Sequence, residues 1–404
     1  MQGSFRVPLL NFSILILAFI FVSFPLGFGV AIKYGVIVLV MISFLLSMDG
    51  KHISRLTMFS ALSIIIILLS SYLYFSTTRM FYVESITLLN SVLLSIFIFI
   101  TIYVALKNDT IKFEQFVKAC IYGGFAYAII KFILVLLIFW NMLDQDAINL
   151  FSPDMSSLGY IGISGFIRVV GVNDYLLVFL FFFTDYCNIK WKKIIKLCFI
   201  VTIFLSFTRY IWVSFVFLFF VNEMLVKKKF VFFTIFTLFV VLAVFAISLF
   251  TPFDLISSIN HRLFAEGALS SGEKYRQSKA LLDGIANNPL FGQGLGSYLP
   301  DYIRNDRLKY GYEVMILALI MQLGIVLFAI VTCVLLLGMI GLFMKTTRSS
   351  VCYFNLLSFF VFILSGFSNP VIISSVSVIL YSLFSGFFIN DASKYKEIPV
   401  LIKR

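Results

Sequence analysis

The chain has 404 residues, of which 61% are hydrophobic and 12% are charged. One soluble core of that length could not bury so many apolar side chains, so we expect lipid to solvate the excess. The net charge of +12 would suit a nucleic-acid-binding protein only if the basic residues shared one exposed face, whereas they are scattered among short loops. The composition therefore predicts an integral membrane protein without a nucleic-acid partner.

Twelve apolar runs predict helices that cross a bilayer, which takes roughly 20 residues each, and the runs lack the alternation of barrel strands. We therefore predict an all-α polytopic membrane protein, with residues 1–404 as a single integral membrane domain. The first run has no cleavage site after it, so we expect a retained helix. The predicted spans are 7–24, 29–47, 56–75, 84–106, 116–140, 168–186, 192–207, 210–226, 230–250, 311–343, 350–367 and 371–389.

The basic residues predict the orientation of these helices. If the N-terminus is cytoplasmic, the cytoplasmic loops and termini hold 19 of the 31 Lys and Arg residues, in agreement with the positive-inside rule. The rule also favours two helices joined by a tight turn within residues 197–221, because one helix would put Lys190 and Lys227 on opposite sides. Both termini are then cytoplasmic, and Arg209 lies at the outer end of a helix pair.

Two outward segments, 141–166 and 251–310, are predicted to be periplasmic loops, and loops of such length are uncommon unless they have a function. In the second, Ser270 or Ser271 can cap a helix that ends at Asn287-Asn288-Pro289. This helix would place Tyr275, Leu282 and Ile285 on one face and Arg276, Lys279 and Asp283 on another. The glycines of the following segment, 289–296, permit a tight turn and close backbone approach.

Several basic residues lie on the predicted outer side, where the positive-inside rule disfavours them. Guanidinium groups recognise phosphate with two parallel hydrogen bonds, so their placement predicts a phosphate-binding role. In the alternative, each arginine reaches the membrane interface or pairs with a nearby acid such as Asp174, Glu266 or Glu273. The outward basic residues include Arg168 at the start of the sixth span, Arg209, and Arg262, Lys274, Arg276 and Lys279 of the large loop.

Two carboxylates and one buried lysine could take part in chemistry. Glu313 begins the tenth span beside Tyr312, and a carboxylate at the membrane border could accept a proton from a hydroxyl group. Asp174 allows the same interpretation, and for both the alternative is an acid favoured at a helix N-terminus. Lys131 lies well inside the fifth span, where a charge costs roughly 2.5 to 3.5 kcal/mol unless it faces a partner or a polar chamber.

The sequence gives little support for a metal or a cofactor. Asp144 and Asp146 have the spacing of the metal-binding pair of some glycosyltransferases, but two carboxylates in an acidic loop are commonly just solvated. His52 and His261 have no second histidine for a zinc site and no convincing nucleophile for a triad. We predict no metal, no cofactor and, because the cysteines lie in or beside apolar runs, no disulfide framework.

Four segments resemble the O-antigen polymerase and O-antigen ligase superfamily of bacterial envelope enzymes. The most specific of the four is the segment Arg276 to Gly296, since these proteins typically have an arginine, a short helix and a Pro-Leu-Phe-Gly-x-Gly turn in a late periplasmic loop. The resemblance covers most of the chain from Arg168 onward, and with it we expect a GT-C-like glycosyltransferase architecture. The segments are Arg168-Val169-Val170-Gly171, Ser206-Phe207-Thr208-Arg209, Arg276 to Gly296, and Tyr312-Glu313.

The resemblance implies metal-independent glycosyl transfer from an undecaprenyl-diphosphate-linked oligosaccharide at the periplasmic face of the bacterial inner membrane. Arginines would then stabilise the diphosphate as it leaves the anomeric carbon. On this interpretation the diphosphate ligands are Arg168, Arg209, Arg276, Arg262 and Lys279, the other substrate contacts are Tyr275, Tyr312 and Lys131, and the general base is Glu313, with Asp174 in reserve.

Ligases of this superfamily usually have a histidine where this chain has Tyr312-Glu313, which favours a polymerase of polysaccharide repeat units. The alternatives are an O-antigen ligase and a lipid-linked oligosaccharide flippase. A transporter usually has two related halves, and no convincing repeat is present here. By analogy, a flippase that delivers repeat units and a chain-length regulator are the expected partners in the same membrane.

Overall fold

The computed structural model describes residues 3–24, 30–47, 55–76, 81–143, 169–229, 266–303, 309–346, 348–367 and 374–390. Within these residues all regular secondary structure is helical. The α-helices are α1 (Gly3–Ser23), α2 (Val30–Ser47), α3 (Arg55–Ser76), α4 (Tyr82–Lys107), α5 (Phe113–Phe139), α7 (Val172–Phe183), α8 (Lys192–Leu205), α9 (Arg209–Val221), α12 (Glu266–Asn287), α13 (Met315–Met344), α14 (Ser350–Leu364) and α15 (Ser375–Ile389). Shorter helical segments are η1 (Thr184–Tyr186), the π-helical η2 (Asn222–Val226) and η4 (Ser365–Phe367).

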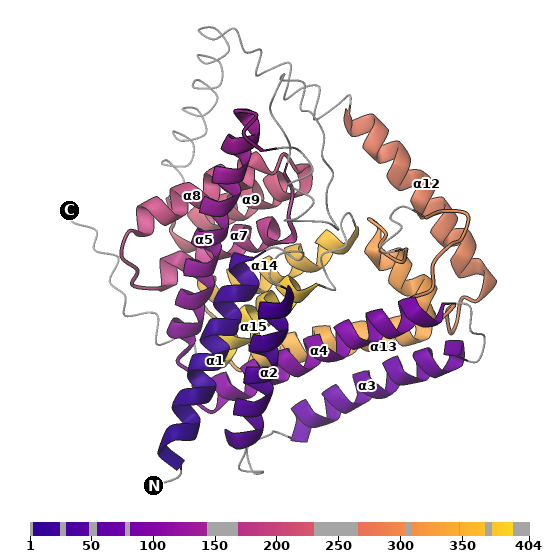
Figure 1. The fold of residues 1–404 in the computed structure, drawn as a ribbon, viewed down its shortest axis with the longest axis horizontal. Helices are drawn as coiled ribbons and strands as arrows, with labels where there is room; N and C mark the ends of the chain where they lie inside the picture. Colours follow the sequence, from indigo (N-terminus) through magenta and orange to yellow (C-terminus); the bar gives the residue numbers. More distant parts are fainter. Residues whose placement is uncertain are drawn as a thin grey trace, which may run out of the picture.

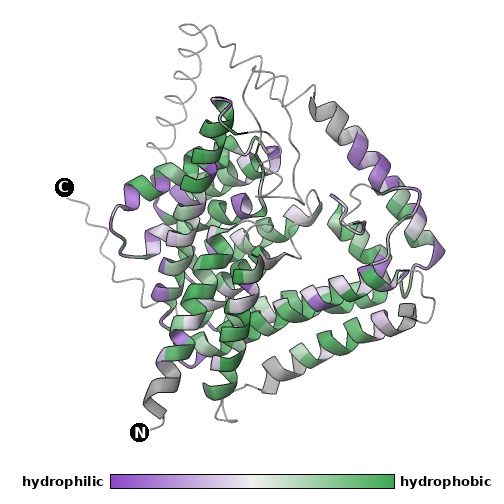
Figure 2. Cartoon of the chain, viewed as in Figure 1, coloured by the Kyte–Doolittle hydropathy of each residue, from purple (hydrophilic) through white to green (hydrophobic). Residues whose placement is uncertain are grey.

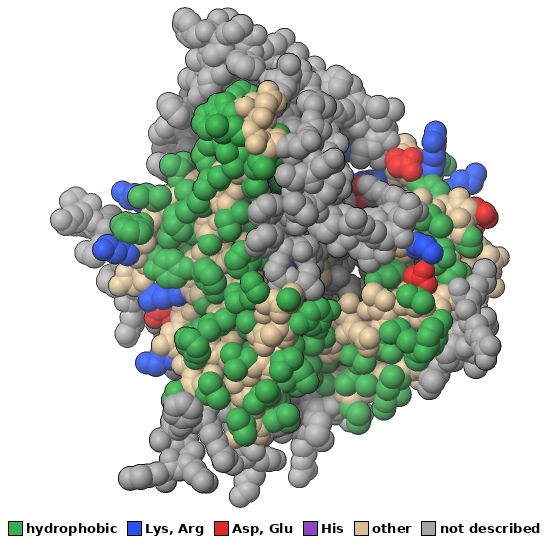
Figure 3. Space-filling view, in the orientation of Figure 1, with side chains coloured by type: hydrophobic (Ala, Val, Ile, Leu, Met, Phe, Trp, Pro, Cys, Tyr) green, Lys and Arg blue, Asp and Glu red, His purple; other side chains and the backbone are tan. Residues whose placement is uncertain are grey.

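The prediction of a polytopic helical membrane protein is confirmed. A helix occupies eleven of the twelve predicted spans, and the remaining span, 230–250, lies outside the described residues. Among the described helices, five are long and apolar enough to cross a membrane: α4, α5, α9 with η2, α13, and α14 with η4. Figure 3 shows the expected surface, with apolar side chains over most of this face and charged ones gathered at two opposite edges.

The largest part of the structure is a bundle built around α7. All twelve residues of α7 are buried, because α5, α8, α9 and α15 pack around it (Figure 1). α1 lies along α5 and α2, and one apolar cluster runs through all of these helices. Phenylalanine rings fill much of this core, including Phe116, Phe183, Phe199, Phe359, Phe384 and Phe387.

A second part of the structure stands beside this bundle. There α3, α4 and α13 run side by side, and α12 crosses the far end of α13 (Figure 1). Figure 2 shows that α12 is the most hydrophilic helix, whereas α3, α4 and α13 are mainly apolar. A separate small core joins α12 to α13 through Leu281, Tyr312, Met315 and Leu319. α12 and the segment after it (the loop region) therefore pack on the end of α13.

The prediction of two helices within residues 197–221 is confirmed by α8 and α9. They are joined by Ser206-Phe207-Thr208, in which Phe207 has φ of 45° and so closes a tight turn. At the end of α8 the carbonyl of Ile203 accepts only a long backbone hydrogen bond, from the N–H of Ser206 (3.3 Å). That carbonyl accepts hydrogen bonds from the Ser206 hydroxyl (2.7 Å) and the Trp212 indole (3.1 Å). The turn is therefore rigid, and it fixes where α9 begins.

α13 is broken at Gly324, which has φ of 73° and ψ of 166°. The break is filled by the glycine-rich segment that follows α12. Gln293 and Gly294 donate their backbone N–H groups to the carbonyls of Met321 and Gln322 (both 2.8 Å). Ile325 and Val326 donate theirs to Pro289 (2.9 Å) and Leu290 (3.2 Å). These four hydrogen bonds pair backbone groups that the break frees, as irregular backbone near a membrane requires.

The break divides α13 into two parts with different surroundings. The part before Gly324 is mostly buried against α12 and the turn, whereas residues 325–344 expose many apolar side chains. At about 1.5 Å per residue, 325–344 is about 30 Å long, close to the thickness of the hydrocarbon core. The predicted span 311–343 corresponds to α13, and within it residues 325–344 are long enough to cross the membrane by themselves.

Candidate functional site

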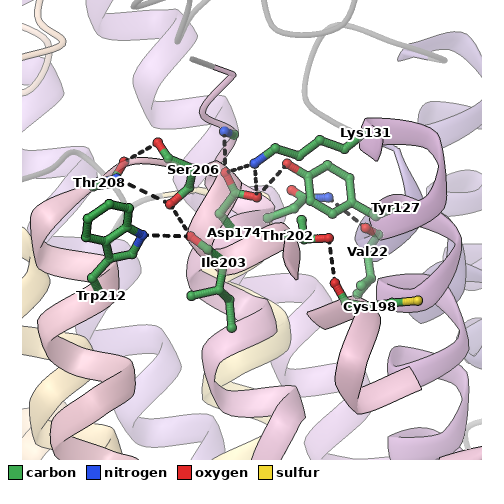
Figure 4. A network of polar contacts seen from close by, with 12 residues as sticks. Val22, Tyr127, Lys131, Asp174, Cys198, Thr202, Ile203, Ser206, Thr208 and Trp212 are labelled. Carbon is green, nitrogen blue, oxygen red and sulfur yellow. Dashed lines mark hydrogen bonds and ion pairs between the residues drawn. The ribbon is translucent and has the colours of Figure 1, made fainter. Parts of the chain in front are cut away.

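Lys131 of α5 and Asp174 of α7 form an ion pair inside the bundle (Figure 4). The Lys131 ammonium lies 2.8 Å from each carboxylate oxygen of Asp174. Tyr127 donates its hydroxyl to Asp174 Oδ1 (3.1 Å), and the backbone N–H of Gly171 donates to Oδ2 (2.9 Å). The side chains of Lys131 and Asp174 are 2% and 0% exposed. Both were predicted to contact the substrate or assist chemistry, yet here they contact each other.

The residues around this pair explain the motif at the start of α7. A Cβ atom on Gly171 would lie 2.5 Å from the Tyr127 hydroxyl, so a larger residue would displace Tyr127 from Asp174. Asn173 donates its side-chain amide to the carbonyl of Val22 (2.7 Å), at the end of α1. The Gly-Val-Asn-Asp sequence therefore connects the start of α7 to α5 and α1 at the same time.

The starts of α7 and α9 lie next to each other. Tyr175 and Tyr210 stack with ring centroids 6.2 Å apart, and Figure 4 shows the turn with Ser206 and Thr208 beside Asp174. Arg209, partly exposed, is the first residue of α9, as predicted for the outer end of the helix pair. Arg168 immediately precedes Val169, the first described residue of this segment, and so lies outside the described residues. Arg262 lies outside them too.

The second group of predicted residues is on α12, where Ile285 of the predicted apolar face packs against the core but Tyr275 and Leu282 do not. The helix starts at Glu266, before the predicted serine cap, and ends at Asn287 as predicted. Its buried face carries Gln277 and Leu281, with Gly284 packed against Met321. Tyr275 is 72% exposed, and Leu282 is also exposed, although both were predicted on the apolar face.

The exposed face of α12 consequently collects several predicted ligands. At 100° per residue, Tyr275, Arg276, Lys279 and Leu282 fall within one continuous face. The Arg276 side chain is 78% exposed and lies 4.0 Å from Glu273, a distance at which an exposed pair contributes little. This face therefore presents two cations beside an aromatic ring.

Glu313 and Tyr312 precede α13 and have different surroundings. Glu313 is 23% exposed and lies 3.6 Å from the ammonium of Lys274 on α12. Tyr312 is fully buried, and its hydroxyl accepts the backbone N–H of Leu299 (2.7 Å). Next to them, the Gln277 side chain accepts the backbone N–H of Val314 (3.0 Å). Tyr312 and Gln277 thus hold the segment in place, and the carboxylate of Glu313 remains partly accessible to solvent.

Contacts from α3 and α4 to the glycine-rich turn were missed by the sequence analysis. Ser85 of α4 donates its hydroxyl to the carbonyl of Leu295 (2.5 Å), and Ser71 of α3 accepts the N–H of Leu295 (3.0 Å). Lys309 lies 3.2 Å from Glu84, whose hydrogen bond raises the pKa of Lys309 and keeps it charged. The sequence feature that indicates these contacts is the presence of serines in apolar helices that end near a long loop.

The two groups of predicted residues are not in one cluster within the part of the chain that the structure describes. α12 lies at the opposite side of the molecule from α8 and α9 in Figure 1. Two segments that could connect them, 144–168 and 230–265, lie outside the described residues, as do Asp144, Asp146 and both histidines. In the described ranges, no group of three His, Cys, Asp or Glu side chains could hold a metal ion.

Comparison with protein families gives one decisive observation. Residues 194–332 match the family model described as O-antigen ligase. This match makes the segment similar to the O-antigen polymerase and ligase superfamily. Comparison with curated protein sequences and with solved structures gave no match.

The superfamily is glycosyltransferase-like and acts on lipid-linked oligosaccharides in membranes. The matched residues are about a third of the chain and run from α8 to the middle of α13, so they contain Arg209, Arg276 and Glu313. They also contain the glycine-rich turn and the break at Gly324. The matched segment thus contains Arg209, Arg276 and Glu313 together with the turn that packs into the break of α13.

Proposed function

We propose that this protein polymerises undecaprenyl-diphosphate-linked oligosaccharide repeat units into O-antigen or a related surface polysaccharide. The observation that carries the proposal is the family match over 194–332, which contains arginines at a helix start and on an exposed loop helix. The reaction would occur at the periplasmic face of the bacterial inner membrane, with both termini of the chain in the cytoplasm.

The surroundings of Arg209 support binding of an anionic group attached to a lipid chain. Trp212, Val213, Val216, Phe217 and Phe220 follow Arg209 on the same side of α9 and line an open apolar groove of about 480 Å³. Residues three, four, seven and eight positions apart share a helix face. A diphosphate at Arg209 would thus have an apolar surface directly below it for its polyprenyl chain.

The arginines supply the electrostatic part of the mechanism. As the anomeric carbon–oxygen bond breaks, negative charge grows on the diphosphate, and Arg168, Arg209 and Arg276 would stabilise it, assisted by Arg262 and Lys279. A hydrogen bond to a charged group contributes about 1.5–3 kcal/mol. Such donors do for this leaving group what a metal ion does for nucleotide sugars, which supports metal-independent transfer.

Glu313 is our candidate for the general base. In the reaction, a hydroxyl at the non-reducing end of one lipid-linked repeat unit attacks the anomeric carbon of the growing chain. One C–O bond forms, the C–O bond to undecaprenyl diphosphate breaks, and the hydroxyl proton passes to Glu313. Partial exposure and the loose contact with Lys274 leave this carboxylate accessible to an incoming hydroxyl, and Tyr275 on α12 offers a ring for a sugar.

Two other functions remain as alternatives. A ligase would use the same diphosphate ligands, and the glutamate at 313 instead of the histidine usual in ligases favours the polymerase. A flippase would also need a polar path through the bundle, whereas the charged pair of α5 and α7 is tightly closed. By analogy, a separate flippase and a chain-length regulator would work with this protein.

The test is the ladder of surface polysaccharide from a deletion strain complemented with wild type, Arg168→Ala, Arg209→Ala, Arg276→Ala or Glu313→Gln. We expect the deletion and these variants to leave the lipid carrier or core capped with a single repeat unit. Exposed Arg348 and Glu114 provide matched controls, so Arg348→Ala and Glu114→Gln should give the full ladder.

The same experiment separates the alternatives, provided that membrane expression is equal. Polymer that accumulates on its lipid carrier without reaching its acceptor would identify a ligase. Single repeats that never reach the outer face would identify a flippase. A full ladder from Glu313→Gln would remove Glu313 as the base without affecting the assignment of polymerase.

A further inference from the structure

The Lys131–Asp174 pair has more contacts than a catalytic carboxylate needs. Both oxygens of Asp174 bind Lys131, one also accepts the Tyr127 hydroxyl, and the other accepts the Gly171 N–H. A general base needs a lone pair directed at the hydroxyl that it deprotonates. With three donors and no exposed surface, Asp174 offers no such direction, and Lys131 is buried equally deeply.

We propose that Lys131 and Asp174 are positioning residues, which hold the starts of α7 and α9 together so that Arg209 is placed to bind the diphosphate. The inference rests on the proposed function, because it concerns the ligands of that diphosphate. It assigns neither residue to substrate contact or proton transfer.

The contacts connect the pair to Arg209. Asp174 accepts the N–H of Gly171 and so fixes the backbone at the start of α7. Tyr175 follows Asp174 and stacks on Tyr210, which follows Arg209. The Tyr210 hydroxyl also donates to the carbonyl of Val361, so the start of α9 is tied to α14 as well. A shift of α7 would thus move the start of α9, where Arg209 lies.

A double-variant experiment distinguishes positioning from chemistry. Asp174→Asn keeps one oxygen that can accept the Gly171 N–H and replaces the other, with the charge, by an amide NH2 group. Lys131→Met nearly keeps the length of the side chain and removes its charge. Each single variant leaves one buried charge without its partner, and the double variant leaves none. If Asp174 or Lys131 were the base or a substrate ligand, a second substitution could not restore activity. If the single substitution displaces a helix start, the second one can restore its position and so the activity.

The assay uses the full-length protein in lipid nanodiscs with a synthetic lipid-diphosphate-linked repeat unit, and monodispersity is checked for every variant. We expect each single variant to raise KM at least 10-fold. The double variant Lys131→Met/Asp174→Asn should bring KM most of the way back to the wild-type value. Lys131→Arg keeps the charge and should stay within 3-fold of wild type. The exposed pair Lys118–Glu114 on the same helix is the control, and its equivalent variants should change KM less than 2-fold.

Hydrogen exchange gives a readout that does not depend on activity. We expect faster exchange in peptides covering 169–176 and 206–212 for each single variant, and near wild-type exchange for the double variant. The inference is overturned if Asp174→Asn lowers kcat at unchanged KM and the double variant is equally inactive. It is also overturned if Lys131→Met leaves exchange at 206–212 unchanged.

The outcome for the proposed function is separate. If the wild-type protein makes no polymer from the synthetic unit while the flippase or ligase phenotype appears in cells, the polymerase proposal fails. Hydrogen exchange then still decides whether the pair holds the two helix starts together.

Discussion

The bundle and the loop region each contain a lysine–carboxylate pair, and the two pairs differ in distance and in burial. Lys131 lies 2.8 Å from both oxygens of Asp174, and both side chains are almost fully buried. Lys274 lies 3.6 Å from Glu313, and the two are 28% and 23% exposed. A buried pair is costly to break, because the remaining charge has no solvent, whereas an exposed pair is worth little. The first pair suits a structural role, and the second leaves a carboxylate accessible.

Breaking the buried pair should have the largest effect on stability. Asp174→Ala leaves the Lys131 ammonium inside the bundle, and removal of one partner of a buried pair costs about 3–5 kcal/mol. We expect a lower midpoint in thermal unfolding of the detergent-solubilised protein, followed by size exclusion. Glu114→Ala, which breaks the exposed pair with Lys118, should cost less than about 1 kcal/mol. Equal midpoints for the two variants would contradict the comparison.

The glycines at the break of α13 test whether the loop region can be detached while the buried pair stays intact. Gly292 and Gly324 both have φ of 73°, and a Cβ on either would overlap backbone atoms of the other segment. A strained left-handed residue costs about 1–3 kcal/mol before any overlap is counted. We expect Gly292→Ala and Gly324→Ala to expose the glycine-rich turn to proteolysis.

Gly338 is the control for this prediction, because it lies in the same helix and a Cβ there would meet nothing within 4 Å. Gly338→Ala should leave proteolysis unchanged and can stabilise the helix by about 0.5–1 kcal/mol. Protection of the turn in Gly324→Ala equal to that in wild type would show that the backbone bonds across the break do not hold the turn.

Gln277 tests what positions Glu313. Gln277→Leu removes the acceptor of the Val314 N–H, and an unsatisfied buried group costs about 1–3 kcal/mol. We expect local loss of hydrogen-exchange protection at the start of α13 and a weaker polysaccharide ladder. Gln277→Glu keeps an oxygen acceptor and should retain more of both. If the start of α13 were as protected from hydrogen exchange in Gln277→Leu as in wild type, Gln277 would not be the residue that positions it.

Changes to the partly exposed Lys274–Glu313 pair should have the smallest effect on stability. Lys274→Gln is expected to cost less than about 1 kcal/mol, since the pair is loose and partly solvated. Glu313→Gln should likewise unfold at the wild-type temperature, yet lose about 10²–10⁴-fold in polymerisation rate if it removes the general base. Thermal unfolding and the rate, measured on the same preparation, check both statements. A large fall in unfolding temperature for Lys274→Gln would make the two pairs alike.

Local patterns gave the sequence analysis its correct predictions. The helices at eleven predicted spans follow from long apolar runs, and the separation of α8 from α9 follows from lysines that must stay on one side. The end of α12 follows from Asn287-Asn288-Pro289, since a proline disfavours helix in the residue before it. On α12, Tyr275 and Leu282 are exposed because the partner surface accepts Gln277 and Gly284 instead, which hydrophobicity does not mark as buried.

The sequence by itself determined that the chain is helical, lies in a membrane and carries arginines at the starts or on the faces of particular helices, because these properties depend on neighbouring residues. Tertiary structure alone decided which charges are paired and which backbone groups need partners. The partner of Lys131 is 43 residues away, and the turn that completes the break at Gly324 comes from before α13. Pairing at such separations depends on how helices pack, and no local pattern records it.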